Sequence, residues 1–346
     1  MARDLTVSVD AMGGDAGPGI ITGALVRAAE RHPNVKFIVH GDEAVIAPLL
    51  QAQPKLAQRV VIRHSPNRVR MEDKPSHVLR RGRDTSMWAA IDSVKNGEAE
   101  AAISAGNTGA LMALSMFNLG ILDGIARPAI ASIWPTMRGQ SIVLDVGANV
   151  AATAEQLVEF AIMGAAYARV IFGLERPSVG LLNVGEEDTK GIDSVKLAGQ
   201  MLRDAPSLSF EYIGFVEGDD ITGGFSDVVV TDGFTGNIAL KTAEGTAKLI
   251  VSYMRSAFKS SLMGKIGAVI ASGALGALKR KLDPRATGGG VFLGLNAVVV
   301  KAHGGTDEIG FAGALDLAID MTEAAINARI TSDRAHIVLQ PVAVAS

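Results

Sequence analysis

The sequence predicts an α/β protein built on a mostly parallel sheet. Over most of its 346 residues, short runs rich in Val, Ile and Leu alternate with longer Ala- and Leu-rich runs of helical period. That alternation is typical of strand–helix–strand units. The length and the 48% hydrophobic content fit one large α/β domain or two lobes that share a sheet, and residues 1–346 are expected to form a single α/β domain.

Six predicted strands end in similar glycine-containing loops. In chain order, LTVSV leads into DAMGGD (10–15), EAAI into SAGNTGA (104–110), SIVL into DVGAN (145–149), VGLL into NVGEEDTKG (183–191), DVVV into TDGFTGN (231–237) and AVVV into KAHGGTD (301–307). In an open parallel sheet the carboxyl ends of the strands share one edge, where ligands bind. Glycines and helix N-termini there present free N–H groups to an anion. The six loops therefore predict a phosphate or oxyanion site.

Composition and missing motifs exclude several kinds of chemistry. The absence of Cys removes a cysteine nucleophile and a thiolate metal site. No dinucleotide fingerprint, P-loop lysine motif, nucleophile elbow or zinc-binding histidine pair is present. No metal and no cofactor are therefore expected, and phosphate is itself a candidate reactant. The net charge of −3 gives no general attraction for nucleic acid. The N-terminus has no signal-peptide pattern, so a cytoplasmic location is expected.

Several polar residues in these loops are candidates for function. Lys190 is suited to holding phosphate or polarising a carbonyl oxygen, or to pairing with Glu187 or Asp188. Asn107, Asn149 and Asn237 are suited to donating to an oxyanion or to capping the next helix; each alone favours capping. His303 is suited to acid–base chemistry or to a structural hydrogen bond. Asp10 is expected to orient donors, because a carboxylate in contact with an anion would repel it.

A basic amphipathic helical hairpin is predicted at 245–285. Between positions 253 and 285 there are seven Lys or Arg residues and one Asp, a local net charge of +6. Apolar residues recur every four positions as one helical stripe, Met254, Phe258, Leu262, Ile266 and Ile270. Such a surface suits an anionic membrane, an acidic protein or a second subunit. The apolar residues, with Lys279, Arg280 and Lys281, form the predicted membrane or partner surface.

The order of the motifs DAMGGD, ISAGNTGALM, LDVGAN, LLNVG-x-ED-x-KG, VVVTDGFTGN and KAHG resembles the PlsX family of phosphate acyltransferases. The resemblance covers residues 5–310. It implies a three-layer αβα fold like that of isocitrate and isopropylmalate dehydrogenases, related to the phosphotransacetylases, with a protruding helical hairpin. It implies transfer of a long-chain acyl group from acyl carrier protein to inorganic phosphate, which yields acyl phosphate for phospholipid synthesis.

The resemblance also assigns residues and partners. Lys190, Asn237 and His303 are implied to be catalytic. The implied phosphate- and carbonyl-binding residues are Asp10, Gly13, Gly14, Asn107, Thr108, Gly147, Asn149, Asp232 and Gly233. The resemblance implies a homodimer that associates peripherally with the inner face of the cell membrane. It also implies that the acyl phosphate product is used by a membrane-bound glycerol-3-phosphate acyltransferase. Two alternatives stay open on the residues alone: a phosphotransacetylase-like enzyme using acyl-CoA, and a non-catalytic scaffold for lipid synthesis.

Overall fold

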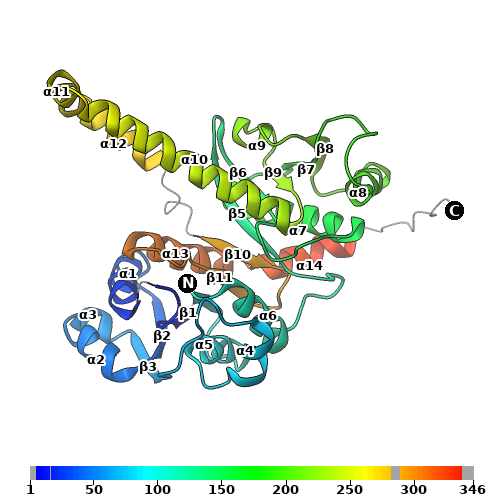
Figure 1. Ribbon diagram of the computed structural model, residues 1–346. Helices are drawn as coiled ribbons and strands as arrows, with labels where there is room; N and C mark the ends of the chain where they lie inside the picture. The colour runs from blue at the N-terminus through cyan, green and yellow to red at the C-terminus, as the bar shows by residue number, and fades with distance from the viewer. Residues whose placement is uncertain (1–4, 16, 282–288, 337–346) are drawn as a thin grey trace.

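The computed structural model describes the backbone of residues 5–15, 17–281 and 289–336, and the side chains of these residues apart from 278–281 and 336. One sheet of eleven strands runs through it in the order β3-β2-β1-β4-β11-β10-β5-β6-β9-β7-β8 (Figure 1). The strands are β1 (Leu5–Asp10), β2 (Val35–Gly41), β3 (Val60–His64), β4 (Ala101–Ser104), β5 (Ala129–Thr136), β6 (Gly139–Leu144), β7 (Ser178–Leu182), β8 (Glu211–Val216), β9 (Val228–Val230), β10 (Gly290–Leu293) and β11 (Val298–Lys301).

Helices cover both faces of this sheet. One face packs against α1 (Gly17–Arg31), α2 (Glu43–Gln51), α3 (Pro54–Ala57), α7 (Ala154–Phe172), α8 (Asp193–Asp204), α13 (Glu308–Glu323) and α14 (Ile326–His336). The other packs against α4 (Pro75–Arg81), α5 (Ser86–Lys95), α6 (Thr108–Leu119), α9 (Asp220–Gly223) and the first part of α10 (Gly233–Lys259). The implied three-layer αβα fold is thus confirmed.

Strand residues divide between the two faces by simple alternation. In β11, Val298 and Val300 join the core under α1 and α13, whereas Val299 joins the core under α5 and α6. All strand positions from 298 to 301 are buried. Because both faces are covered, the central strands are continuous apolar runs rather than alternating ones.

The strand directions correct one expectation. Strands β1, β4 and β11 are mutually parallel, but the antiparallel pairings β11–β10, β10–β5 and β5–β6 reverse the direction before β6, β9 and β7. The six glycine loops therefore do not share one edge. All six follow the carboxyl ends of their strands, but they form two sets of three, because the strands of one set run in the opposite direction to those of the other. We call them the first loop set (10–15, 104–110, 301–307) and the second loop set (145–149, 183–191, 231–237).

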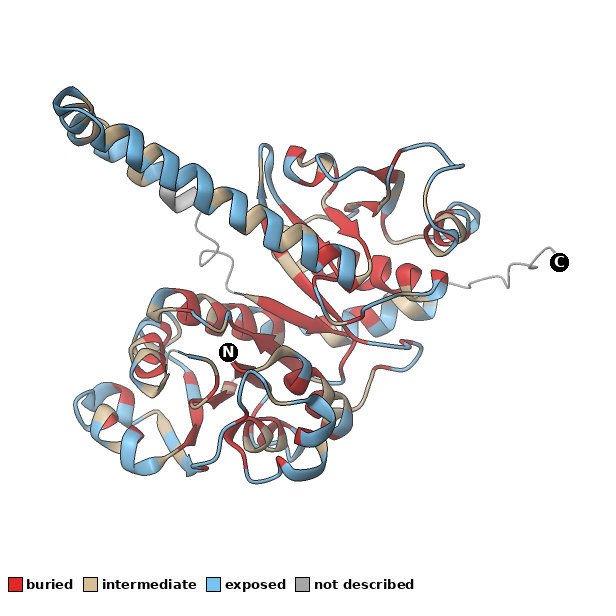
Figure 2. Cartoon of the chain, viewed as in Figure 1, coloured by how far each residue is buried: buried red, intermediate tan, exposed pale blue. Residues whose placement is uncertain are grey.

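The hairpin region projects from the sheet as expected, but its helices are divided differently. The 27-residue helix α10 is followed by α11 (Leu262–Ile270) and α12 (Ser272–Lys281). Ser261 is extended, with φ −144° and ψ 162°, and its hydroxyl caps α11. The prediction of one continuous apolar stripe is therefore wrong: Met254 and Phe258 are half-buried on α10, whereas Leu262 and Ile266 are exposed on α11. Figure 2 shows the mostly exposed surface of this projection.

Candidate active site

The first loop set is held together by backbone contacts. The amide of Asp15 donates to the carbonyl of Gly304 at 3.0 Å, and the amide of Ala302 donates to that of Ser104 at 3.0 Å. Gly14 has φ +78°, and a Cβ there would lie 2.8 Å from the Gly304 oxygen. Only glycine fits this backbone conformation and spacing. The sequence therefore brings the loops after β1, β4 and β11 into direct contact.

Beneath these loops, three polar residues form one row across neighbouring strands. Asp10 pairs in register with Ser104, and Ser104 pairs with Lys301. All three are buried. The Asp10 carboxylate accepts from the hydroxyls of Ser104 and Ser86, each at 2.6 Å, and from the amide of Met12 at 3.2 Å.

Burial raises the pKa of Asp10, and the donated hydrogen bonds partly oppose that shift. A Cβ at Gly13 would lie 2.5 Å from the Asp10 carboxylate, so the loop closes directly over the acid. Asp10 therefore holds the backbone of its loop and is not open to solvent.

Lys301 supplies the positive end of this row. Its ammonium donates to the carbonyl of Ala105 at 3.2 Å and to that of Ala302. Burial lowers the pKa of Lys301 to about 8, although the negative charge of Asp10 opposes this. A buried ammonium with a depressed pKa is a frequent mark of a functional site.

His303 lies just beyond, at the exposed end of the loop. The Gly305 amide donates to its Nδ1 at 3.3 Å. Partial burial lowers the pKa of His303; the charge of Glu244 opposes that shift, and those of Lys241, Lys301 and Lys248 add to it. The imidazole is therefore neutral at pH 7, and because Nδ1 accepts, its hydrogen lies on Nε2.

Asn107 and Thr108 begin α6 in the same loop set. The side-chain oxygen of Asn107 caps the helix by accepting from the Ala110 amide at 3.0 Å. Its amide group donates to the carbonyls of Met71 and Asp73 at 2.7 and 3.1 Å. Asn107 thus performs the capping role that the sequence favoured and fixes the 71–73 loop beside it.

The second loop set is organised by Asp145, a residue that the sequence reasoning did not single out. Its carboxylate accepts from the amides of Ile130, Gly147, Ala148 and Asn149 and from the Asn149 side chain, at 2.7–3.1 Å. The Asn149 oxygen accepts from Arg127 Nε at 2.7 Å, and its amide also donates to the Pro128 carbonyl at 2.8 Å. Asn149 is buried, and its side-chain oxygen and amide group are both hydrogen-bonded within the protein.

The start of α10 packs on the 145–149 loop. Asp232 caps the helix through the Thr235 amide at 2.8 Å. A Cβ at Gly233 would lie 2.5 Å from the Asn149 carbonyl oxygen, so the two loops touch. Asn237, one turn later, is exposed beside Gly147. Of the predicted residues in the 145–149 and 231–237 loops, Asn237 has an exposed side chain.

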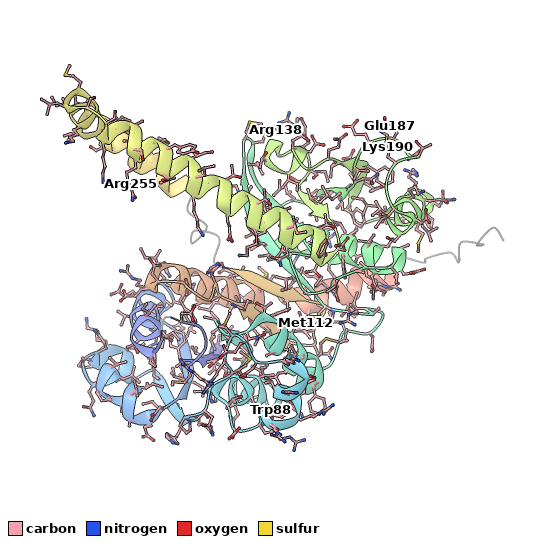
Figure 3. The ribbon with its side chains drawn as sticks, in the orientation of Figure 1. Trp88, Met112, Arg138, Glu187, Lys190 and Arg255 are labelled. Carbon is pink, nitrogen blue, oxygen red and sulfur yellow. The ribbon has the colours of Figure 1, made fainter. Side chains whose placement is uncertain are left out.

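Lys190 lies in the remaining loop of the second set. Its side chain is 52% exposed and its Nζ lies 3.4 Å from the Glu187 carboxylate, which is the pairing left open from the sequence. In Figure 3 both residues project from the loop between β7 and α8, well apart from Met112 on α6. The structure thus leaves Lys190 apart from the first loop set.

Helix α10 links the two sets. It starts at Gly233 in the second set, and its Lys241, Glu244 and Lys248 act electrostatically on His303 in the first set. From Asn237 to Lys241 a helix rises only ~6 Å. The sequence reasoning missed Lys241, Lys301 and Ser86 as well as Asp145. For Lys301, the signal available was a lysine ending a run of buried valines.

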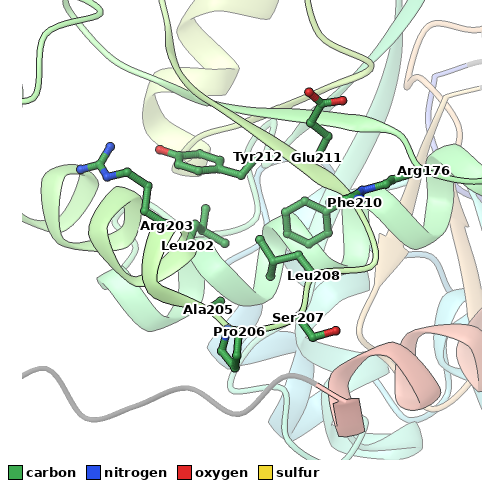
Figure 4. Close-up of a pocket in the computed structure, with 10 residues that line it drawn as sticks. All are labelled: Arg176, Leu202, Arg203, Ala205, Pro206, Ser207, Leu208, Phe210, Glu211 and Tyr212. Atoms are coloured by element: carbon green, nitrogen blue, oxygen red, sulfur yellow. The ribbon is translucent and has the colours of Figure 1, made fainter.

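A hollow between α8 and β8 lies outside both loop sets (Figure 4). It is lined by Arg176, Leu202, Arg203, Ala205, Pro206, Ser207, Leu208, Phe210, Glu211 and Tyr212. Among residues 5–15, 17–281 and 289–336, no group of three or more His, Asp or Glu side chains is arranged to hold a metal. Within these same ranges no helix is both long and apolar enough to cross a bilayer.

The fold of the chain is similar to that of solved phosphotransacylase structures. A branched-chain phosphotransacylase from Enterococcus faecalis superposes with a TM-score of 0.57 at 17% identity, covering 92% of this chain and 99% of that one. A EutD phosphotransacetylase from Staphylococcus aureus gives 0.55 at 17% identity, covering 96% and 94%. At these identities the likeness concerns the fold alone.

Sequence relatives are more specific. A family model described as a fatty acid synthesis protein matches residues 5–329. A phosphate acyltransferase of Parvibaculum lavamentivorans is 56% identical over 96% of this chain and 92% of the relative, and one of Azorhizobium caulinodans is 55% identical over 95% and 93%. The chain is therefore an acyltransferase. It belongs to the PlsX phosphate acyltransferase family, as its motifs indicated.

Proposed function

We propose that the protein transfers a long-chain fatty acyl group from acyl carrier protein to inorganic phosphate and releases acyl phosphate for phospholipid synthesis. The names of its relatives support acyl transfer to phosphate, and the matching family model supports a place in lipid synthesis. The observation that carries the proposal is the group of charges at the β11 loop: the buried ammonium of Lys301, and Lys241 and Lys248 of α10, which act on His303 together with one carboxylate, that of Glu244.

The reaction needs little covalent help from the protein. A phosphate oxygen attacks the thioester carbonyl carbon, a tetrahedral oxyanion forms, and the C–S bond breaks to release the thiolate of the carrier. The protein must hold phosphate against the carbonyl and stabilise the oxyanion. In the first loop set, Nε2–H of His303 and the glycine-rich backbone are the donors for this task. Gly13, Gly14 and Thr108 shape the site, and Asp10 and Asn107 hold it.

From the second loop set we assign Asn237 as the side chain facing substrate. Asn149, Gly147, Asp232 and Gly233 support it by fixing the start of α10. Lys190 has an exposed ammonium with one carboxylate neighbour. We keep it as a candidate that reaches the substrate from the outer loop, and its substitution provides the test given below.

The donor and the chemistry are tested together. Purified protein is incubated with labelled phosphate, EDTA and either palmitoyl-carrier protein or palmitoyl-CoA, and acyl phosphate is trapped with hydroxylamine. We expect product with the carrier donor in the presence of EDTA. Equal or faster turnover of palmitoyl-CoA would favour the phosphotransacetylase-like alternative. No product from either donor would favour the scaffold.

We further propose that the protein is a cytoplasmic homodimer which docks on the inner face of the cell membrane through its hairpin. Helix α11 has no buried residue. Leu262, Met263, Val269 and Ile270 at its surface are each more than 70% exposed, and lysines at 259 and 265 flank them. Apolar side chains bordered by lysines suit an anionic leaflet. Docking would bring unstable acyl phosphate close to the membrane glycerol-3-phosphate acyltransferase that consumes it.

A further inference from the structure

The row of Asp10, Ser104 and Lys301 crosses three adjacent parallel strands on one face of the sheet. Its members pair directly in register, and strands lie about 4.8 Å apart. The Cα atoms of Asp10 and Lys301 are therefore separated by roughly 10 Å, with Ser104 between them. Ser104 and Ser86 donate to Asp10, whereas Lys301 donates to two carbonyl oxygens. The pair interacts through space and not by direct contact.

The two carbonyls that Lys301 holds belong to different loops. Ala105 follows β4 and Ala302 follows β11, so one ammonium ties two loops of the site from below. In a planar trans peptide the C=O and N–H groups point in opposite directions. With the Ala302 carbonyl turned toward Lys301, the amide of His303 is turned away from the lysine. The buried charge thus sits behind a backbone donor of the candidate phosphate site.

We propose that Lys301 is a positioning residue for phosphate: its buried ammonium fixes the loops after β4 and β11 and provides the positive charge beneath the phosphate. This inference rests on the proposed function. Asp10 has the matching task of keeping the ammonium charged in a buried position. A buried ammonium of this kind is costly without a compensating charge.

The proposal predicts a pH dependence. The charged groups that act on Lys301 are Asp10 from β1, which favours its charged form, and Lys241 from α10, which opposes it; His303 is adjacent and neutral. Because the pKa of Lys301 is about 8, its charge is present below pH 8 and is lost as the pH rises above 8. The KM for phosphate should therefore rise between pH 7 and 9, while the KM for the acyl donor should not.

The first test replaces the lysine. For Lys301→Gln at pH 7 we expect a rise of about 10–100-fold in the KM for phosphate, the scale of one charge-assisted interaction, with a flattened pH dependence and an unchanged KM for the acyl donor. Lys95→Gln, at an exposed lysine ending α5, is the matched control and should behave as wild type. A Lys301→Gln protein that keeps both the wild-type phosphate KM and its pH dependence would overturn the proposal.

A second pair of variants separates charge from folding. Asp10→Asn keeps Lys301 but removes its compensating charge, so the rise in phosphate KM should begin at lower pH; an unmoved profile would contradict the proposal. The double variant Asp10→Asn with Lys301→Gln carries no buried charge in the row. It should recover the melting temperature of wild type but not phosphate affinity. Recovery of both would show a purely structural role and would also overturn the proposal.

Phosphate binding is also measured without turnover, as the rise in melting temperature on adding inorganic phosphate at pH 7. Wild type should be stabilised and Lys301→Gln should not. If wild type forms no acyl phosphate yet shows this difference, the proposed function fails and the assignment of Lys301 stands. If both proteins are stabilised equally, the assignment fails whatever the activity.

Discussion

Asp145 provides the sharpest test of how the site is held. We consider Asp145→Asn, which preserves shape and removes one acceptor. In wild type, Oδ1 accepts from the amides of Ile130, Gly147 and Ala148, and Oδ2 accepts twice from Asn149. The best arrangement of an asparagine keeps its oxygen on the first three donors and directs its NH₂ group at the two donors of Asn149.

Two buried N–H groups then lose their acceptor, at about 1–3 kcal/mol each. The free energy of unfolding at pH 7 should fall by ~2–6 kcal/mol, measured by urea unfolding with tryptophan fluorescence. The control is Asp42→Asn, a partly exposed helix cap that accepts from the Ala44 amide at 3.0 Å. Asparagine caps as well as aspartate, so that change should stay within about 0.5 kcal/mol. A loss below about 1 kcal/mol for Asp145→Asn would refute the argument that these bonds fix the loop.

Three further predictions concern other parts of the chain. If Lys190 reaches the substrate, Lys190→Ala lowers kcat/KM by about 10²–10³-fold with an unchanged melting temperature; wild-type kinetics in the folded variant would remove it from the site. Leu262→Glu with Val269→Glu should abolish co-sedimentation with anionic vesicles while oligomeric mass and activity on soluble donor persist; a lost dimer would instead make α11 a subunit contact. Burial lowers the pKa of His40 to about 4, below the usual ~6.5, so stability should fall as the pH drops from about 6.5 to 4. That fall in the free energy of unfolding should be smaller in His40→Gln by about 3 kcal/mol. The same pH dependence of the free energy of unfolding in wild type and variant, measured by urea titration, would contradict the lowered pKa of His40.

Much of the fold was accessible from the sequence, but the direction of the strands was not. The six loops were placed correctly at strand ends because apolar runs and glycines are local signals. The pairing of β10 with β5 and of β5 with β6 is not local, and these antiparallel pairs divide the loops into two sets. Hydrophobic period carries no information on which strands become neighbours.

The site shows the same limit. The cap at Asn107 was recognised because capping depends on residues three positions away, whereas the cap of α10 proved to be Asp232, which the sequence reasoning had not considered for that role. Lys301 and Asp145 were missed, since each also has a partner distant in the sequence: Lys301 donates to Ala105 after β4, and Asp145 accepts from Ile130 on β5. The break between α10 and α11 escaped the helical count because Leu262 keeps the four-residue spacing across Ser261, whose hydroxyl starts a new helix.

Because α10 is one unbroken helix, it fixes the distance between the loops around His303 and the tip of the projection. From the turn of Lys241, which acts on His303, to the end of the helix at Lys259 the axis rises ~27 Å, close to the diameter of a small domain. One uninterrupted helix cannot shorten, so a surface touched by the tip is kept about that far from the loops around His303. If the tip docks on the membrane and a carrier protein delivers the acyl group, as proposed above, the length of this one helix limits how large that carrier can be.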